Sequence, residues 1–340
     1  MKAIQVEKVG KLEIVDIPVP AVTDPRDVLV KVTSASVCAS DLGIFRGSNS
    51  LARYPAVIGH EYAGVVESAG GLAAAVKPGD LVAVDPVRSC GRCFSCLAGR
   101  QNVCLNLRVS GVHLPGGFSE YVVAPGDRCH RLDPGKIPPD LACLVEPYSI
   151  GVQVNRRAGV EKGDRVLVIG SGPAGLCVLA DAKARGAVVV SADLIESRLR
   201  AAEEFGADRT VNAAREDLAV AVADFTGGAG MPVVIDSACT LESFPQSLEL
   251  ASPAGRVVVM GNLDQPSPVA QVSITKKELT VIGTRLNNRR FPEAIDGMER
   301  GVYSPGKLRT HSFHFTKIAE AFDLIMNHPE LVRKVVLTFD

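Results

Sequence analysis

Four of the nine cysteines of this 340-residue chain lie close together, at Cys90, Cys93, Cys96 and Cys104. Zn²⁺ binds four thiolates in a tetrahedron at about 2.3 Å, and thiolates gathered in this way need a cation. The spacing C-x2-C-x2-C-x7-C differs from the paired knuckles of zinc ribbons and from the ferredoxin run. The cluster therefore predicts a structural zinc site, with an iron–sulfur cluster and unligated cysteines as alternatives.

Arginines flank this cluster, at Arg88, Arg92, Arg100 and Arg108. A zinc ion with four thiolates carries surplus negative charge, which nearby arginines offset. Clustered arginines are also typical of surfaces that bind nucleic acid. We favour charge compensation and keep nucleic-acid binding as the alternative.

A second set of residues combines sulfur, imidazole and carboxylate. Cys38 lies in the sequence VCASD, and His60 and Glu61 lie together in GHEYAG. This mixture of ligands suits zinc. Glu146, in LVEPY, precedes an expected helix start at Pro147 and is the fourth candidate ligand. An isolated histidine is usually structural, but the neighbouring motifs favour a metal site.

A glycine-rich turn lies between a predicted strand at 166–169 and a helix-forming stretch at 176–185. It reads Gly170, Ser171, Gly172, Pro173, Ala174 and Gly175. The first glycine permits a tight turn, the second lets the backbone approach a pyrophosphate, and the third allows close helix packing. The helix N-terminus then faces the phosphates. The pattern alone is weak, but its place between a strand and a helix predicts a dinucleotide site.

Asp193 ends the next predicted strand. An acidic side chain at this point accepts hydrogen bonds from the adenosine ribose 2′-OH and repels the 2′-phosphate of NADP. Arg198 lies nearby and could accommodate a phosphate, so NADP stays open as an alternative. The sequence favours NAD as the cofactor. A simple helix-capping role is the other interpretation of Asp193.

The composition limits the class of protein. With 46% hydrophobic residues the chain can bury a large core, and its length suits two domains. A formal net charge of -1 and a pI near 6.6 give no broad attraction to nucleic acid or anionic lipid. Small molecules are therefore the expected partners.

The cellular location can also be predicted from the sequence. The N-terminus carries charges where a signal peptide is apolar, and no stretch is uninterruptedly apolar over about 18 residues. Cysteines without paired spacing suit a reducing compartment. We expect a cytoplasmic protein that does not span a membrane.

The patterning changes along the chain. Short β-branched runs broken by Pro, Gly and Asp predict an antiparallel β domain in about the first 130 residues. These runs are 27–33, 62–67, 80–85 and 119–123. Alternating strands and helices then predict a parallel sheet with crossover helices. Its expected strands are 165–169, 187–192, 233–237 and 256–260. The chain should end with helices at 292–300 and 316–327 and a strand at 334–339.

Together these motifs resemble the zinc-dependent medium-chain alcohol dehydrogenases, in their polyol and sugar-acid branch. The resemblance covers essentially the full length. The matching motifs, in the family's order, are Cys38-Ala-Ser-Asp41, Gly59-His-Glu61, the four-cysteine lobe, Gly116-Gly-Phe-Ser-Glu-Tyr121, Glu146-Pro147 and the glycine fingerprint. The segments 111–120, 144–148, 276–280 and 284–287 are most similar to L-galactonate and L-gulonate 5-dehydrogenases and starvation-sensing dehydrogenases.

The resemblance implies a fold in two parts. A GroES-like, β-rich catalytic domain at 1–148 would carry a structural zinc lobe at 88–108. A Rossmann domain, a doubly wound parallel sheet that binds NAD, would occupy 149–286. The chain would return to the catalytic domain at 287–340. The family also implies a homo-oligomer, either a tetramer or a dimer.

The resemblance further implies two zinc ions per chain and a mechanism. A catalytic zinc held by Cys38, His60 and either Glu61 or Glu146 would polarise the substrate hydroxyl, and a hydride would pass to NAD. Ser40 would receive the hydroxyl proton.

One departure from the family concerns this proton. A histidine usually continues the relay in the polyol branch, but here Gly43 and Ile44 follow Asp41 and Leu42. The relay histidine is absent, as is a tyrosine that sorbitol dehydrogenases use to contact substrate. The proton must leave through water, the ribose hydroxyls or another group.

The expected substrate is a secondary alcohol of a polyol or sugar acid, of the L-gulonate or L-galactonate type. Its carboxylate calls for an arginine, with Arg285 as the first candidate and Arg46 as the second. Asn287 is a further substrate candidate, and Gly261 and Thr284 are expected beside the cofactor. The alternatives are threonine or another amino alcohol, an alditol such as sorbitol, a zinc-free quinone reductase, and a non-catalytic regulator that binds zinc and NAD(H).

Overall fold

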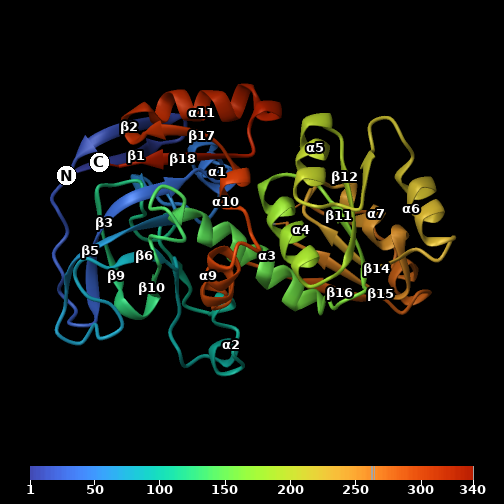
Figure 1. Cartoon of the computed structure of the whole chain (residues 1–340), viewed down its shortest axis with the longest axis horizontal. Helices are drawn as coiled ribbons and strands as arrows, with labels where there is room; N and C mark the ends of the chain where they lie inside the picture. Colours follow the sequence, from blue (N-terminus) through green and yellow to red (C-terminus); the bar gives the residue numbers. More distant parts are fainter. Residues whose placement is uncertain (262, 264, 340) are drawn as a thin grey trace. The chain divides into compact units, whose positions relative to one another are not determined.

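The computed structural model describes residues 1–261, 263 and 265–339. The chain forms two compact units, which we call unit 1 and unit 2 (Figure 1). Unit 1 comprises Met1–Glu146 and Asn287–Asp340, and unit 2 comprises Pro147–Leu286. The prediction had placed these boundaries after residues 148 and 286. Unit 1 is therefore discontinuous in sequence, whereas unit 2 is one continuous segment.

Unit 1 is β-rich. Its strands are β1 (Lys2–Lys8), β2 (Lys11–Asp16), β3 (Asp27–Ser36), β4 (Ala56–Val57), β5 (Glu61–Ala69), β6 (Leu81–Val84), β7 (Val87–Arg88), β8 (Arg108–Val109), β9 (Tyr121–Pro125), β10 (Cys129–Arg131), β17 (Arg309–His314) and β18 (Lys334–Thr338). A seven-stranded sheet has the order β10-β6-β5-β3-β18-β17, with β9 also paired to β3. A three-stranded sheet, β2-β1-β4, and a two-stranded sheet, β7-β8, accompany it.

The central strand β3 shows why these residues form a sheet. Val28, Val30 and Val32 are buried and alternate with less buried neighbours, as expected when successive side chains point to opposite faces. β3 pairs antiparallel with β5, β9 and β18. The two C-terminal strands β17 and β18 run parallel to each other, because α11 (Ile318–Asn327) provides the crossover between them.

Short helices complete unit 1. They are α1 (Ala39–Arg46), α2 (Phe94–Leu97), α9 (Phe291–Glu299), α10 (Pro305–Leu308) and α11, with 3-10 turns η1 (Gln101–Val103), η2 (Gly126–Arg128), η3 (Ala142–Leu144), η4 (Phe315–Lys317) and η5 (Pro329–Leu331). The hydrophobic core gathers side chains from β3, β5, β18, α11 and the segment before β9, including Tyr62, Phe118 and Phe322. Thus the N-terminal strands and the C-terminal segment of unit 1 share one hydrophobic core.

Unit 2 is a parallel sheet with helices. Its sheet has the order β13-β12-β11-β14-β15-β16, and every neighbouring pair in it is parallel. Its strands are β11 (Arg165–Ile169), β12 (Val188–Asp193), β13 (Arg209–Asn212), β14 (Met231–Asp236), β15 (Ala251–Val259) and β16 (Thr280–Gly283). Its helices are α4 (Pro173–Ala184), α5 (Glu196–Glu204), α6 (Leu218–Thr226), α7 (Ser243–Leu250) and α8 (Val272–Thr275), with α3 (Val145–Ala158) starting at the end of unit 1.

The strand order of unit 2 reverses between β11 and β14. In parallel sheets of this kind, ligands bind outside the carboxyl ends of the strands at the point of reversal. The predicted strands 165–169, 187–192, 233–237 and 256–260 all fall on observed strands, with shifted ends. Among the described residues, no helix is both long and apolar enough to span a membrane.

Candidate functional site

Asp41 holds Cys38 in place at the start of α1. Cys38 is the N-cap residue of that helix and has an extended backbone. The fully buried Asp41 carboxylate accepts the backbone N–H groups of Cys38 (2.8 Å) and Gly59 (3.1 Å). Asp41 Oδ1 also lies 3.8 Å from His60 Nδ1. One carboxylate therefore joins the segments that carry Cys38 and His60.

Cys38, His60 and Glu61 form a compact cluster in unit 1, which we call the Cys38 site. Glu61 begins β5, and His60 precedes it. His60 is 7% exposed and Glu61 is 2% exposed. Each of the three residues brings one ligand atom to within 4.8 Å of the other two. The structure thus brings together the three residues that the sequence proposed, with donors that zinc prefers.

A buried lysine neutralises Glu61. Lys334 Nζ, on β18, donates to Glu61 Oε1 (2.6 Å), and Ser36 Oγ, on β3, donates to Oε2. The Lys334 side chain is 4% exposed. Burial alone would lower the pKa of Lys334, but the negative charges of Glu61 and Cys38 outweigh it and raise the pKa above its usual value. Both oxygens of Glu61 therefore have partners within the protein.

Glu146, the second residue of α3, lies beside the Cys38 site. It is 3% exposed and interacts electrostatically with His60, Glu61 and Lys334. Burial raises the pKa of Glu146 to about 8, with His60 opposing the shift and Glu61 adding to it. It is not one of the three residues whose ligand atoms lie mutually within 4.8 Å. As a zinc ligand, Glu146 therefore remains a prediction.

The electrostatics of the Cys38 site fit a cation. Burial alone would lower the pKa of His60, but Cys38 and Asp41 raise it well above its usual value. Metal ligands bind in their deprotonated forms, so a bound cation replaces the proton that this environment favours. The half-buried Cys38 and the buried His60, Glu61 and Glu146 together offer sulfur, nitrogen and oxygen donors, which are a suitable set for zinc.

Ser40 lies two residues after Cys38 on α1. Its hydroxyl oxygen is buried and has no hydrogen-bond partner among the described residues. A buried hydroxyl without a partner costs about 1–3 kcal/mol, so a group that bonds this oxygen would be stabilised there. A substrate hydroxyl or a water molecule would satisfy it.

The four lobe cysteines also come together, in the segment 88–108 that we call the cysteine lobe. The four sulfur atoms lie within 4.8 Å of one another, and none of them forms a disulfide. Cys93 Sγ lies 3.4 Å from Cys96 Sγ and 3.8 Å from Cys104 Sγ. A tetrahedron with metal–sulfur distances of about 2.3 Å separates its sulfurs by about 3.8 Å. The lobe therefore fits one zinc ion.

Backbone and hydroxyl groups prepare these sulfurs for a metal. The N–H groups of Cys90 (3.2 Å) and Asn106 (3.3 Å) donate to Cys104 Sγ. A hydrogen bond with Ser95 lowers the pKa of Cys93 to about 5, and backbone N–H groups add to this shift. Burial instead raises the pKa of Cys96 to about 11. A cation would be needed to hold all four as thiolates at neutral pH.

In unit 2, the glycine-rich turn joins β11 to α4. Gly170 has φ 96°, a left-handed conformation, and a Cβ there would lie 2.7 Å from Ala238 N. At Gly175 a Cβ would lie 1.9 Å from Gly170 O, so only glycine allows this turn to close on the helix. Gly172 is the N-cap of α4 and faces open space, and Pro173 is the first residue of the helix. The helix N-terminus is thus open to an anion.

Asp193, the last residue of β12, is already engaged by this turn. Its Oδ2 accepts the Ser171 backbone N–H (2.8 Å), and its Oδ1 accepts that of Ile195 (3.0 Å). Arg198, on α5, lies 3.8 Å from Oδ2. Ser171 thus connects the turn to Asp193, a contact that no local sequence pattern indicates. The acidic side chain therefore lies at the edge where a ribose is expected, with its position fixed by backbone groups.

The other two predicted cofactor residues lie at the same edge of the sheet. Gly261 follows β15 and packs against Cys239, while Thr284 follows β16 and donates its N–H to Val259 O (3.1 Å). The Thr284 hydroxyl oxygen is buried without a hydrogen-bond partner among the described residues. The carboxyl ends of neighbouring parallel strands share one edge, so these residues and the glycine turn border the predicted ligand position.

The three predicted substrate residues have different environments. Arg285 is exposed in unit 2, and Arg46 is exposed in the last turn of α1, where a cation also stabilises the helix C-terminus. Asn287 is fully buried in unit 1, and its Nδ2 donates to Asp85 Oδ1 (3.1 Å). Its Oδ1 is buried without a hydrogen-bond partner among the described residues, so Asn287 stays a predicted substrate residue.

Sequence reasoning assigned no role to Asp41, Lys334 or Ser36. Asp41 could have been found, because an acidic residue three positions after a helix start typically accepts backbone N–H groups there. Lys334 gives no local signal, since it meets Glu61 only when β18 pairs with β3. Ser36 lies opposite Glu61 because of the register between β3 and β5, and this register could not be predicted from the sequence.

Two family models match the chain. Residues 24–134 match the alcohol dehydrogenase GroES-like domain, and residues 173–300 match the zinc-binding dehydrogenase domain. The starvation-sensing protein RspB of Escherichia coli K12 is 40% identical over 343 residues, covering 100% of this chain and 99% of that protein. The chain belongs to the zinc-type alcohol dehydrogenase family.

A related enzyme and a related crystal structure match the chain over nearly its whole length. L-galactonate-5-dehydrogenase of Escherichia coli K12 is 32% identical over 327 residues, covering 94% of each chain. The crystal structure of the rspB alcohol dehydrogenase of Escherichia coli CFT073, in complex with NADH, is 39% identical with a TM-score of 0.95. It covers 100% of this chain and 99% of its own. The predicted family and the fold of a GroES-like domain with a Rossmann domain are confirmed.

Proposed function

We propose that this dehydrogenase uses zinc and NAD to oxidise a secondary alcohol of a polyol or sugar acid, with L-gulonate or L-galactonate as the first candidates. The observation that carries the proposal is the Cys38 site, where a half-buried sulfur meets buried imidazole and carboxylate donors within 4.8 Å. The membership of the chain in a family of alcohol dehydrogenases supports the same reaction.

Cys38, His60 and one of the two glutamates would hold the zinc. When bound, the zinc would polarise the substrate hydroxyl and lower its pKa toward neutrality. Glu61 is held by Lys334 and Ser36, whereas Glu146 is buried beside the site and has a pKa raised to about 8. Each carboxylate is therefore a candidate zinc ligand. Glu61 would have to share or break its hydrogen bond with Lys334 in order to bind the zinc.

Ser40 would receive the proton of the substrate hydroxyl. Its oxygen is buried and has no partner among the described residues, so it can both accept this proton and donate its own. Gly43 carries no side chain to continue the relay. We propose that the proton leaves Ser40 through ordered water or a cofactor hydroxyl.

Unit 2 would bind NAD by the glycine turn and Asp193. The backbone N–H groups at the start of α4 would bind the pyrophosphate, and Asp193 would accept hydrogen bonds from the adenosine ribose. Bound NAD would accept the hydride. The related crystal structure in complex with NADH supports this cofactor.

A substrate carboxylate would be bound by Arg285, with Arg46 as the second candidate. The relationship to L-galactonate-5-dehydrogenase supports a sugar-acid substrate. Arginine suits this role because its planar guanidinium can bond both carboxylate oxygens.

A substrate panel tests the proposal. The purified protein, with its zinc content measured, is incubated with NAD and with aldonates, alditols, threonine and simple alcohols, while NADH absorbance is followed. We expect about two zinc ions per chain and the highest kcat/KM with a sugar acid. The Arg285→Ala variant should raise KM for the sugar acid while KM for an uncharged alditol stays unchanged.

Three results would count against this function. Absence of zinc would favour quinone reduction. Faster turnover of threonine or sorbitol than of any aldonate would reject the sugar-acid substrate but would leave the alcohol dehydrogenase reaction in place. Tight NADH binding with no turnover of any alcohol would favour a regulator.

A further inference from the structure

The chain returns from unit 2 to unit 1 through residues 284–289, which we call the crossover. Thr284, on the unit 2 side, donates its backbone N–H to the last carbonyl of β15 (3.1 Å). Asn287 is the first residue of the returning chain and is fully buried in unit 1. Arg285 and Leu286 are therefore the residues between the two anchored ends.

Asp85 anchors Asn287 in unit 1. Its Oδ1 accepts hydrogen bonds from Asn287 Nδ2 (3.1 Å) and from the backbone N–H of Val87 (3.0 Å). Its Oδ2 accepts one from Arg128 Nη1 (3.4 Å), and Asp85 is 2% exposed. Hydrogen bonds to an ionised carboxylate are stronger than those between neutral groups. Asn287 is thus held by a carboxylate whose own position is fixed by other segments.

Asn288, the next residue, has a separate anchor. Its Nδ2 donates to Gly99 O (2.8 Å), in the cysteine lobe. This bond sets the orientation of the amide, and Oδ1 is buried without a hydrogen-bond partner among the described residues. A buried polar atom without a partner costs about 1–3 kcal/mol, so this orientation is kept at a cost. Two successive asparagines therefore fix the crossover on two different partners.

The backbone of the crossover is left-handed on either side of these asparagines. Leu286 has φ 51° and Arg289 has φ 58°. A left-handed backbone costs such residues roughly 1–2 kcal/mol, and glycine and asparagine adopt it more readily. Strain of this kind persists only where the surrounding contacts hold it. The contacts of Asn287 and Asn288 therefore maintain a turn that Leu286 itself disfavours.

This turn carries Arg285, the first candidate for binding a substrate carboxylate. Arg285 is exposed and directly precedes Leu286. Bidentate binding of a carboxylate depends on the direction of the planar guanidinium. A mobile backbone at Leu286 would let Arg285 point in many directions, and ordering it would weaken substrate binding. A fixed turn removes this ordering cost.

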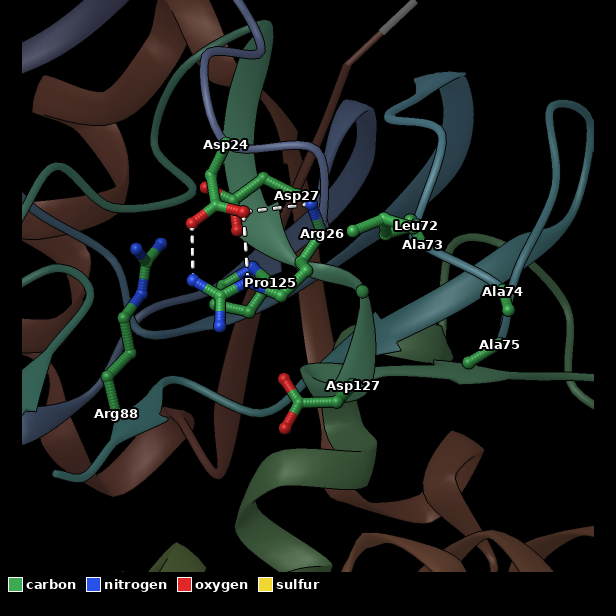
Figure 2. Close-up of a pocket in the computed structure, with 11 residues that line it drawn as sticks. Asp24, Arg26, Asp27, Leu72, Ala73, Ala74, Ala75, Arg88, Pro125 and Asp127 are labelled. Atoms are coloured by element: carbon green, nitrogen blue, oxygen red, sulfur yellow. Dashed lines mark hydrogen bonds and ion pairs between the residues drawn. The ribbon is translucent and has the colours of Figure 1, made fainter. Parts of the chain in front are cut away.

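Arginines elsewhere in unit 1 are less suited to a substrate carboxylate. A hollow of about 620 Å³ is lined by two arginines but also by three aspartates (Figure 2). Arg26 pairs there with Asp24 (2.6 Å), and Figure 2 shows the two side chains facing each other. Like charges repel, so the aspartates of the hollow disfavour a further carboxylate. Arg285 therefore remains the first candidate.

We propose that Leu286 and Asn288 are positioning residues that hold Arg285 in the direction needed to bind a substrate carboxylate. They contact neither substrate nor cofactor and act through the backbone of Arg285. The consequence is selectivity for an alcohol that carries a carboxylate over an uncharged alditol of the same chain length. This role rests on the proposed function, because it requires that Arg285 bind a sugar acid.

Steady-state kinetics of the zinc-loaded enzyme test this role, with NAD and with an aldonate and an alditol of equal chain length. Asn288→Ala should raise KM for the aldonate about 10-fold, because a binding group displaced by about 1 Å loses much of its effect. The value of kcat should stay within about twofold, since binding lost equally from the ground and transition states changes KM alone. KM for the alditol should not change.

Asn327→Ala is the matched control for Asn288→Ala. Asn327 Nδ2 also donates a hydrogen bond within unit 1, to Asp323 Oδ1 (2.7 Å), but both residues lie on α11. This variant should keep both wild-type KM values. Circular dichroism and the thermal midpoint show that each variant is folded.

Two replacements of Leu286 separate the effect of the turn from that of the side chain. Leu286→Val should raise KM for the aldonate as Asn288→Ala does, because a β-branched residue resists a left-handed backbone. Leu286→Asn should keep the wild-type KM, because asparagine adopts this backbone although it lacks the leucine side chain. In an Arg285→Ala background, neither Leu286→Val nor Asn288→Ala should raise KM further.

Failure of the positioning role and failure of the proposed function give different results. A wild type with no preference for the aldonate overturns both. A wild-type preference that Asn288→Ala and Leu286→Val leave unchanged overturns the positioning role alone, as does an equal rise of both KM values. Additive effects in the Arg285→Ala background also overturn it, because the two residues would then act by a route other than Arg285.

Discussion

The cysteine lobe and the Cys38 site both gather ligands that suit zinc, but different parts of the chain hold them. The lobe takes four sulfurs from a short segment that contributes nothing to the main core of unit 1. The Cys38 site takes its donors from α1 and β5, with Asp41, Ser36 and Lys334 bonded behind them. The lobe therefore depends on its ligand residues for its shape. The Cys38 site is held by hydrogen bonds and paired strands that do not involve a metal.

This difference predicts opposite responses to loss of the metal. A segment without a core depends on its metal for a folded shape, because metal-binding free energy is then folding free energy. A site built on paired strands keeps its shape and loses only its chemistry. Variants of the two sites should therefore differ in whether they lose structure or activity.

The largest effect is expected for Cys93→Ser. The loss of one thiolate should release the lobe metal, a contribution on the order of 10 kcal/mol in small zinc-dependent domains. We expect zinc to fall from about two ions to about one per chain, with faster amide hydrogen exchange confined to residues 88–108. Exchange measured by mass spectrometry checks this.

The control is Cys129→Ser, a cysteine outside the lobe, which should keep both ions. If the Cys93→Ser lobe stays as protected as in the wild type, the lobe does not depend on its metal.

Cys38→Ala should change chemistry with little change in structure. We expect kcat/KM to fall about 10³-fold or more, because several kcal/mol of charge stabilisation in the transition state is lost. NADH binding, measured by fluorescence titration, should stay within about twofold, since its predicted site is in unit 2. The thermal midpoint should fall less than in Cys93→Ser. Unchanged turnover would refute the zinc mechanism.

Lys334→Met tests the buried ion pair that supports the Cys38 site. Removing one partner of a buried ion pair costs about 3–5 kcal/mol, because the remaining charge has no compensation. The free energy of unfolding should fall by this amount in denaturant titrations of metal-free protein. Lys2→Met is the matched control, because the Lys2–Asp16 pair (3.2 Å) is exposed and such pairs contribute only about 0–1 kcal/mol. Equal losses in both variants would show that Lys334 does not support the site.

The smallest effect is expected for Ser95→Ala. Ser95 hydrogen-bonds Cys93 Sγ (3.2 Å) and lowers the pKa of Cys93, so its removal should raise that pKa from about 5. Protons would then compete better with the metal, and zinc release during acid titration should occur at higher pH, by about 1 unit or less. A chelating dye that reports free zinc measures the midpoint. A midpoint moved to lower pH would contradict this order of effects.

The parts that were predictable from sequence have local causes. The cysteine spacing, the glycine turn and the strand–helix alternation each lie within a short segment, and the strands predicted around Asp193 and Gly170 fall on β12 and β11. Physical rules for turns and periodicity act over such distances. The family resemblance then extended these observations to the whole fold, which the comparisons confirm.

The contacts that were missed join segments far apart in the sequence. Lys334 reaches Glu61, and Asn287 reaches Asp85, only after distant segments meet. No local pattern states that a lysine on a C-terminal strand will be buried, since lysines are usually exposed. For Asn287 the sequence predicts a substrate contact, and the structure adds a bond to the buried Asp85 that the sequence does not indicate.

The pairing of β18 with β3 has a consequence for synthesis of the chain on the ribosome. Unit 2 is complete once residue 286 has emerged, so it can fold while translation continues. Lys334, the cation that compensates Glu61, follows unit 2 in the chain and is therefore made after it. The part of unit 1 made before unit 2 must wait for this later segment, and until then Glu61 has no buried counter-charge.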